Sequence, residues 1–302
     1  MSSTLLQLMG QVTAELGLGS PASVIGNPSQ EVVQLLALMQ ASGYELLRKA
    51  DWQQLTTRYT FFTSFVTTTG TIANASQVIT GIPSTAGLDT TYMIVGGGFP
   101  NATFVQSVDS GTQVTATAKS TSTASNQTIY FQKAKYTLPA DYDAIVPRTQ
   151  WDTSAHWEML GPCDAQQWEW LLSGWIATGP RVRWRLLGGN FQIWPGFSSA
   201  EGLGFEYRSK AWARSATGTV QNSFLADTDT CIYPDRLVVL LTKLKFFEIQ
   251  NFDTTALYRD YMAELETDIA QNVSAPNLSF APHPGSVLIT WNNIPDSGYG
   301  LS

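Results

Sequence analysis

Apolar side chains recur at helical spacing near the start of the chain. Residues 3–17 carry a stripe made of Leu5, Leu8, Val12 and Leu16. Residues three or four apart lie on one face of a helix, so this stripe predicts an amphipathic helix. Gly17 and Gly19 follow it and should end it.

A second helical pattern follows Asn27 and Pro28. Asn27 suits the N-cap, Pro28 the first helical position, and Gln30 completes a capping box. The apolar stripe of this helix contains Val32, Leu36, Met39, Gly43, Leu46 and Ala50. We expect the two helices to form an antiparallel hairpin that ends near Trp52.

The late part of the chain returns to helical spacing. Tyr233-Pro234-Asp235 should open a helix that runs to about Ile249, and Asp253 should cap another. The second of these carries Leu257, Tyr261, Leu265 and Ile269 on one face.

The pattern between residues 64 and 133 is of another kind. Ser and Thr dominate, and short runs rich in β-forming residues alternate with turns. The runs are Val78–Ile79, Tyr92–Val95, Thr103–Val105, Gln113–Ala116 and Thr128–Phe131. Such composition also occurs in disordered segments, but the regular Val, Ile and Phe positions favour a small β-sandwich or barrel.

Gly96-Gly97-Gly98 lies within this segment and raises the question of a phosphate-binding loop. Such a loop leads into a helix N-terminus, where free N–H groups meet the anion. Here Phe99, Pro100 and another β-type run follow. We therefore interpret the glycines as a turn between strands, which uses their access to positive φ.

Residues 134–213 hold most of the tryptophans. Asp164 can cap a short helix that carries Trp168, Leu171, Leu172 and Trp175. Three strands should follow, over residues 182–187, 191–194 and 204–212, with turns at Gly188-Gly189 and Pro195-Gly196. We expect them to form an antiparallel meander.

The last segment, 273–302, loses the helical pattern at Pro276, Pro282, Pro284 and Pro295. Residues 287–291 have the pattern of a single strand, typical of an arm that adds to a neighbouring sheet. A frayed terminus fits the composition as well. If it is an arm, its anchoring side chains should be Phe280, Val287, Ile289 and Trp291.

The sequence therefore predicts an α+β protein. N- and C-terminal helices should form a bundle that holds the antiparallel meander. The expected parts are a helical hairpin (1–60), an inserted all-β module (64–133), the rest of the core (134–272) and a docking arm (273–302).

The fraction of charged residues and the net charge restrict the classes of function that the sequence can have. Of 302 residues only 14% are charged, and the formal net charge is −7. DNA binding needs a basic face, and the only local cluster is Arg181, Arg183 and Arg185, so a DNA reader is not expected. Low charge suits large subunit contacts, although a merely neutral surface would look the same.

The residue types of catalysis are sparse. The two histidines, His156 and His283, have no nucleophile nearby in sequence, although triads assemble in space. The paired carboxylates, Asp141/Asp143 and Asp227/Asp229, suit a cation or glycosidic acid–base work, but lie where Asp usually bonds its own backbone. Cys163 and Cys231 form no metal motif. We expect no enzyme activity, cofactor or metal.

Neither a leader nor a membrane span is expected. No basic-then-apolar segment opens the chain, and the longest strongly apolar helical run, Leu237–Leu241, is too short for a bilayer.

Several stretches together resemble the head-to-tail adaptor proteins of short-tailed bacteriophages, also called connector or tail tubular A-type proteins. They are LLQLMGQVTAELGL, NPSQEVVQLLALMQASGYELLRKADWQQLT, YTLPADYDAIVPRTQWDTS, LGPCDAQQWEWL and DTDTCIYPDRLVVLLTKLKFFEIQNFD. Their order and spacing carry the likeness, which covers most of residues 4–60 and 134–272. The inserted module is similar to Ig-like or bacterial-surface-like modules of phage structural proteins.

The resemblance implies a structural virion protein of the neck or tail, made in the bacterial cytoplasm. Family members form a twelve-fold ring beneath the portal protein, extend the DNA channel, join the tail nozzle and often help seat tail fibres. DNA would slide through without specific binding, which suits an acidic chain.

Two rival functions remain. A virion-associated carbohydrate-binding or cell-wall-degrading protein would need exposed coplanar aromatics, or two carboxylates in a cleft. A metal- or nucleotide-dependent enzyme is disfavoured by the missing motifs.

Overall fold

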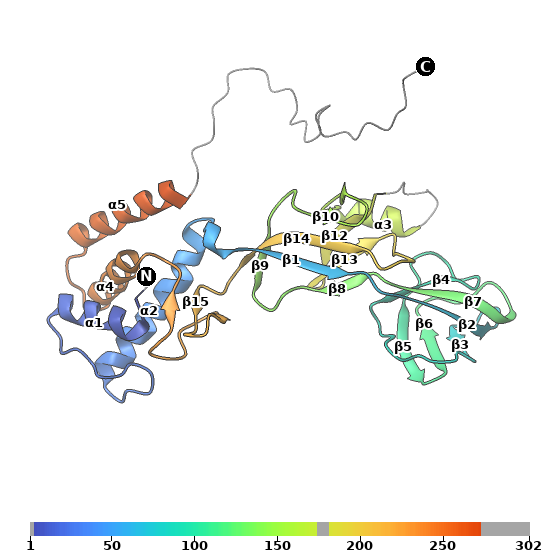
Figure 1. The fold of residues 1–302 in the computed structure, drawn as a ribbon, viewed down its shortest axis with the longest axis horizontal. Coiled ribbons are helices and arrows are strands. Elements are labelled where there is room, and N and C mark those ends of the chain that lie inside the picture. The colour runs from blue at the N-terminus through green and yellow to red at the C-terminus, as the bar shows by residue number, and fades with distance from the viewer. Residues whose placement is uncertain (1–2, 174–180, 273–302) are drawn as a thin grey trace, which may run out of the picture.

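The computed structural model describes residues 3–173 and 181–272. Most of the helices gather at one end of an elongated molecule, and antiparallel sheets with one short helix make up the rest (Figure 1). The predicted α+β class is confirmed. We refer to three parts: a helical body, a central β body, and the insert of residues 65–133.

Helix α1 (Leu5–Leu16) and helix α2 (Gln30–Lys49) open the helical body. Thr4 caps α1: its side chain accepts from the Gln7 N–H, and the Gln7 side chain accepts from the Thr4 N–H at 2.9 Å. Gly17 ends α1 with a φ of 73°, as predicted.

The predicted start of α2 is wrong. Asn27 does not cap the helix, which begins at Gln30 after Ser29. The Asn27 side chain instead accepts from the Ser29 N–H at 2.9 Å and donates to the Ser23 carbonyl at 2.7 Å. Asn readily bonds nearby backbone in this way, so it holds the preceding turn.

Helix α4 (Asp235–Ile249) and helix α5 (Thr255–Asn272) complete the helical body. Both lie close to their predicted positions, and Asp253 accepts from the Thr255 N–H at 3.0 Å. The predicted hairpin is not the main contact, because α4 packs against both α1 and α2 more extensively than these pack on each other.

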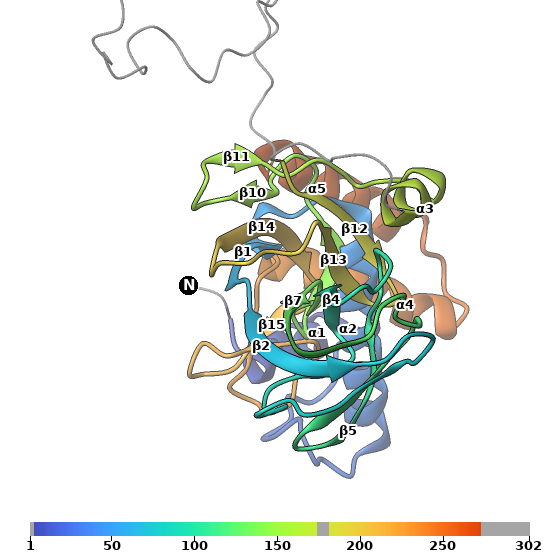
Figure 2. The same cartoon turned by 90° about the vertical axis from the view of Figure 1, so that its right-hand side faces the viewer.

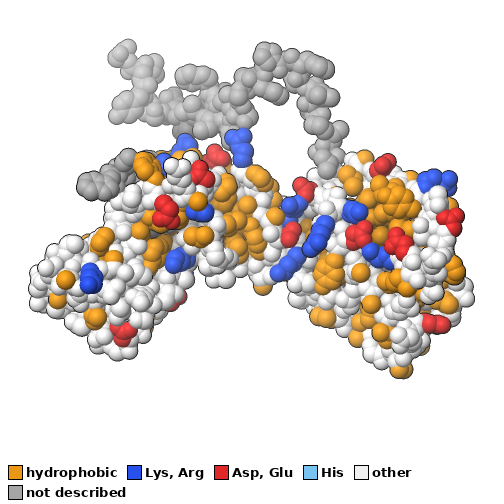
Figure 3. All heavy atoms as spheres, turned by 180° about the vertical axis from the view of Figure 1, so that it is seen from behind, with side chains coloured by type: hydrophobic (Ala, Val, Ile, Leu, Met, Phe, Trp, Pro, Cys, Tyr) orange, Lys and Arg blue, Asp and Glu red, His pale blue; other side chains and the backbone are white. Residues whose placement is uncertain are grey.

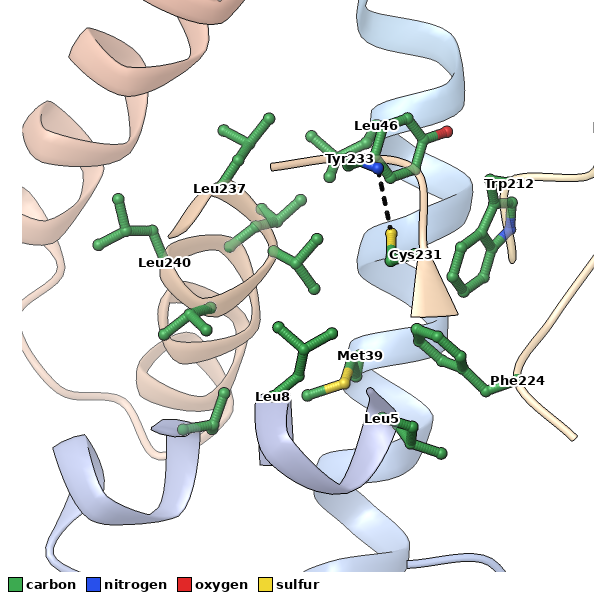
Figure 4. Packing of buried hydrophobic residues seen from close by; sticks show 14 of the residues in the cluster. Leu5, Leu8, Met39, Leu46, Trp212, Phe224, Cys231, Tyr233, Leu237 and Leu240 are labelled. Atoms are coloured by element: carbon green, nitrogen blue, oxygen red, sulfur yellow. Dashed lines mark hydrogen bonds between the residues drawn. The ribbon is translucent and has the colours of Figure 1, made fainter. Parts of the chain in front are cut away.

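The core of the helical body draws on both ends of the chain (Figure 4). Its labelled members are Leu5, Leu8, Met39, Leu46, Trp212, Phe224, Cys231, Tyr233, Leu237 and Leu240. A small sheet supplies part of it: β15 (Ala213–Arg214) lies between β16 (Val220–Gln221) and β17 (Thr230–Cys231). Burying each large aliphatic side chain favours folding by roughly 1.5–3 kcal/mol, so this body depends on the two ends meeting.

The central body contains two facing sheets. In the first, a short 3-10 turn at Gln53–Leu55 leads into β1 (Thr56–Phe62), which pairs with β14 (Gly202–Ser209). β14 also pairs with β9 (Tyr142–Ile145) and β10 (Trp151–Asp152), and β10 pairs with β11 (Trp157–Glu158). In the second sheet, β13 (Asn190–Trp194) lies between β12 (Arg183–Leu187) and β8 (Lys135–Thr137).

The predicted meander is therefore wrong. β12 and β13 form the expected hairpin, with Gly188 and Gly189 at φ of 59° and 73° in its turn. β14, however, pairs with β1 in the opposite sheet. Its aromatic side chains face those of β13 across the core, and the rings of Phe191 and Phe205 stack at 4.9 Å.

Helix α3 (Ala165–Ser173) covers the central body beside the insert. The predicted cap is confirmed, since the Asp164 carboxylate accepts from the Gln167 N–H at 2.7 Å. Trp168 and Leu171 are buried as expected, whereas Trp175 lies outside the described residues.

The insert contains two three-stranded antiparallel sheets around one core. β7 (Ala124–Lys133) lies between β2 (Phe65–Ile72) and β4 (Tyr92–Gly96), and β6 (Gln113–Ala116) lies between β3 (Val78–Ile79) and β5 (Val105–Ser110). Four of the predicted runs are confirmed as strands, whereas the run at residues 103–105 only touches the start of β5. β2 was not predicted, because its Thr-rich sequence lacks apolar alternation.

Gly96 ends β4 and Gly97 and Gly98 follow it, with φ of 93°, 62° and 68°, which confirms the turn. At Gly98 a Cβ would collide with Ser122.

The insert leaves and rejoins the central body at one place. The Lys133 N–H donates to the Ser64 carbonyl at 2.9 Å, and Phe65 pairs with Gln132. Figure 2, which looks from the insert end, shows β2, β4 and β7 in front of the central body. Met93 of β4 packs with Trp168, Leu171 and Trp194, so one apolar cluster fixes the insert against α3.

Candidate assembly surfaces

The side chains predicted as anchors, Phe280, Val287, Ile289 and Trp291, lie outside the described residues, as does the whole arm. The structure does describe where the chain enters this segment. Asn272, the last residue of α5, is buried, accepts from the Gln53 N–H at 3.0 Å and donates to the Asp51 carbonyl at 2.8 Å. Helix α5 therefore ends beside the chain that leads into β1.

An exposed apolar surface lies at the corner between α4 and α5. Ile249, Phe252 and Tyr258 have 58%, 58% and 53% of their surface exposed. The Phe252 ring meets Phe247 edge to face at 5.6 Å, which holds Phe252 in the corner. We call Ile249, Phe252 and Tyr258 the helical-end patch. Large exposed apolar side chains close together in the chain are candidates for a contact site.

A second apolar surface lies where β1 passes into the insert. Phe62, at the end of β1, is 76% exposed, and Phe65 begins β2. Tyr130 of β7 lies between Thr67 and Val95 across the sheet, so it shares a face with Phe65 and Val95. We call Phe62, Phe65, Val95 and Tyr130 the insert-base patch.

Sequence reasoning missed both patches. The signal for the first was Phe252, an aromatic residue in a turn and outside either helical stripe. The signal for the second was the pair Phe62 and Phe65 at the boundary of a Thr-rich segment. The space-filling view shows apolar side chains gathered over the helical and central bodies, with charges scattered between them (Figure 3).

Ion pairs tie α4 to the other helices. Glu15 of α1 meets Lys243 at 2.6 Å and Arg236 at 2.7 Å. Burial by itself would raise the pKa of Glu15, but hydrogen bonds and positive charge from these two side chains outweigh it and lower that pKa.

Glu45 of α2 is held in the same way by Lys245 of α4, at 2.5 Å, and by Lys49. Burial again acts to raise the pKa of Glu45, and the two lysines lower it overall. These pairs tie α4, which carries Ile249 of the helical-end patch, to α1 and α2.

A cavity of about 900 Å³ lies between the helical and central bodies. The residues that line it are Tyr44, Glu45, Leu47, Arg48, Lys49, Asp143, Lys210 and Asn222. Charges of both signs lie among them.

The carboxylates of the pair Asp227/Asp229 accept hydrogen bonds from backbone N–H groups within the fold. Asp227 accepts from the N–H groups of Val24 and Ile25, and Asp229 from those of Leu225 and Ala226. This agrees with the structural interpretation of the pair.

The two carboxylates of the other pair, Asp141 and Asp143, have different surroundings. Asp141 accepts from the Tyr207 hydroxyl at 2.9 Å and the Ser209 hydroxyl at 2.6 Å, whereas Asp143 lines the cavity. Within residues 3–173 and 181–272, no three His, Cys, Asp or Glu side chains come together as metal ligands.

The remaining candidate residues for catalysis are the two histidines and the two cysteines. His156 sits in the β10–β11 turn with a φ of 58°, and His283 lies outside the described residues. Both cysteines are free. Burial raises the pKa of the Cys163 thiol and raises that of Cys231 to about 12, so neither favours the reactive thiolate.

Most of the described tryptophans are buried: Trp52, Trp168, Trp184, Trp194 and Trp212. Trp157 of β11 and Trp170 of α3 are 41% and 52% exposed. These two come from different elements and leave the question of glycan contact open to experiment.

None of the described helices is both long and apolar enough to cross a membrane. A scan against protein-family models finds no match to this chain, and a search of curated proteins finds none either.

Proposed function

We propose that the protein is a non-enzymatic subunit of a bacteriophage head-to-tail adaptor. In this proposal a twelve-fold ring of subunits joins the portal protein to the tail nozzle and extends the DNA channel in the neck of the virion. The proposal starts from the sequence resemblance. The described surfaces are compatible with it.

The observation that carries the proposal is the pair of unlike apolar patches. A closed ring is built from head-to-tail contacts, so each subunit needs two different surfaces that fit each other. The helical-end patch and the insert-base patch lie at separated places along the long axis (Figure 1). In a ring the first would meet a neighbour on one side and the second a neighbour on the other.

The helical body joins both ends of the chain, which suits such a role. Its core is closed by both ends of the chain and by the ion pairs of Glu15 and Glu45. In the proposed ring the four long helices form the bundle, and the insert is an Ig-like module that projects outward and is free to seat tail fibres. Residues 273–302 would dock on the portal.

Electron microscopy of the purified protein, alone and mixed with its cognate portal protein, tests the proposal. Rings of the expected symmetry, or a collar added to the portal, would support it. A chain lacking residues 273–302 should form no collar. A full-length protein that stays monomeric and ignores the portal would refute the adaptor role.

Glycan binding is a second candidate, favoured only by the exposure of Trp157 and Trp170. Flat exposed aromatics can stack on sugar rings. A glycan array with the wild type and a Trp157→Ala/Trp170→Ala double variant tests this. Binding that the double variant loses would favour this second function.

A further inference from the structure

β1 is an edge strand with one occupied side. It pairs with β14 over its whole length, from Thr56 opposite Arg208 to Phe62 opposite Gly202, without a bulge. Among the described residues, no strand or backbone group pairs with its other side. A regular free edge is a ready template for another strand.

Natural edge strands usually carry a protective feature, such as proline, lysine or a bulge. β5, the edge of an insert sheet, has two register shifts and an aspartate. β1 has neither bulge nor proline, and Arg58 is its one charged residue. Its sequence, TTRYTFF, consists mainly of β-forming residues.

The two faces of β1 specify what a partner strand should look like. Tyr59 and Phe61 point toward the central core but are only partly buried. Arg58, Thr60 and Phe62 are exposed on the opposite face. A partner should therefore alternate, with apolar side chains beside Tyr59 and Phe61.

Residues 287–291, Val-Leu-Ile-Thr-Trp, have this alternation. Val287, Ile289 and Trp291 would lie on one face of a strand, and Leu288 and Thr290 on the other. The described chain also ends in the right place, because Asn272 is hydrogen-bonded to Asp51 and Gln53 just before β1.

The connecting length is sufficient. β1, with 7 residues, spans roughly 24 Å at about 3.4 Å per residue. Residues 273–286 reach up to roughly 45 Å when extended. Every point along β1 is within reach, and the tether gives this segment a high effective concentration beside its own β1 compared with that of a second copy.

We propose that residues 287–291 add to the free edge of β1 in the same chain, with Val287, Ile289 and Trp291 beside Tyr59 and Phe61. The added strand completes the cover of the central core. The pairing needs only this chain, and it occupies Val287, Ile289 and Trp291, so it is an alternative to the docking of these three side chains on the portal. Ring formation through the two patches is independent of it.

Crosslinking in the full-length chain tests the pairing. In a Cys163→Ser background, with Cys231 left in place because it is buried, Thr60→Cys and Thr290→Cys would share one face of the extended sheet. A short bis-maleimide should join them within one chain, which mass spectrometry of the linked peptide detects. Val108→Cys with Thr290→Cys is the matched control, since Val108 is exposed on an edge strand of the insert, and it should give no such link.

Hydrogen exchange gives a second measurement without cysteines. Amides of residues 56–62 that do not face β14 should be protected in the wild type. They should exchange at least about tenfold faster in an Ile289→Asp/Trp291→Asp variant. Links that form only between two chains would overturn the same-chain pairing. Exchange that is the same in both proteins would overturn strand addition altogether.

Discussion

Two glycines inside helices, Gly10 in α1 and Gly43 in α2, have opposite surroundings. A Cβ built on Gly43 would overlap the Trp212 indole, whose Cη2 would lie 2.6 Å away. A Cβ on Gly10 meets nothing within 4 Å. Gly43 is therefore required by the close approach of α2 to Trp212, whereas Gly10 only weakens its helix.

The same substitution should have opposite effects at the two positions. Gly43→Ala should destabilise the protein by about 2 kcal/mol, because overpacking outweighs the gain in helix propensity. Gly10→Ala should stabilise it by about 0.5–1 kcal/mol. Urea denaturation measures both, and equal shifts in the midpoint would contradict the proposed role of Trp212.

The ion pairs of Glu15 should make stability depend on pH. Because the folded state lowers the Glu15 pKa, the stabilisation is complete above the ordinary Glu pKa of about 4.5 and is lost as the pH falls through the lowered value. Glu15→Gln should cost roughly 0.5–1 kcal/mol near neutral pH, an amount kept small by solvent screening. The difference from wild type should shrink in acid and in high salt.

Glu266→Gln provides a control for this experiment. Glu266 is exposed on α5 and takes part in none of the ion pairs of the described residues. Its substitution should leave the free energy of unfolding nearly unchanged from pH 3 to 7. A Glu15→Gln effect that stays constant over that range would show that the charge of Glu15 is not responsible.

At the scale of elements, the helices were predictable because their signals are local. The apolar spacing and capping residues placed α1, α3, α4 and α5 close to their observed positions. The start of α2 was misplaced because Asn27 has two uses, as a cap and as a turn former. Only the actual hydrogen bonds to Ser23 and Ser29 distinguish them.

Strand pairing was less predictable because it depends on distant segments. The β12–β13 hairpin followed from Gly188-Gly189, but the partner of β14 is β1, far away in the sequence. A local pattern contains no information about that partner. The candidate site shows the same limit, since the two patches arise from side chains that the fold leaves exposed.

The end of α5 depends on one side chain. Asn272→Ala should remove both hydrogen bonds to residues 51 and 53 and destabilise the protein by about 1 kcal/mol, since it leaves two partly buried backbone groups without these partners. Hydrogen exchange should rise in the last turn of α5. Asn272→Asp keeps the acceptor for the Gln53 N–H but places a carboxylate against the Asp51 carbonyl, so it should recover only part of the loss. Full stability of Asn272→Ala would show that the contact is incidental.

At the scale of the whole molecule, the two patches differ in position and in the helices and strands that carry them. The helical-end patch lies at the corner between α4 and α5, where ion pairs tie α4 to α1 and α2, and the insert-base patch lies on β1, β2, β4 and β7. Under the adaptor proposal, both should matter for assembly and neither for folding.

Phe252→Asp should therefore abolish ring formation. It should leave the free energy of unfolding of the free chain within about 0.5 kcal/mol of wild type, as expected for an exposed site. Light scattering measures assembly with the portal, and circular dichroism measures folding. Val108→Asp, a charge added to the exposed edge strand β5 of the insert, is the matched control and should assemble normally. Assembly by Phe252→Asp would remove the helical-end patch from the proposed interface.

The insert enters and leaves through neighbouring positions, where the Lys133 N–H meets the Ser64 carbonyl. A gene segment that encodes residues 65–132 can therefore be exchanged for another of any size whose ends also meet, without moving the strands on either side. What such an exchange must preserve is the contact of Met93 with Trp168 and Trp194. Under the adaptor proposal, such an exchange would replace Phe65, Val95 and Tyr130 of the insert-base patch together with the outer module, so a new module would also bring its own ring contact.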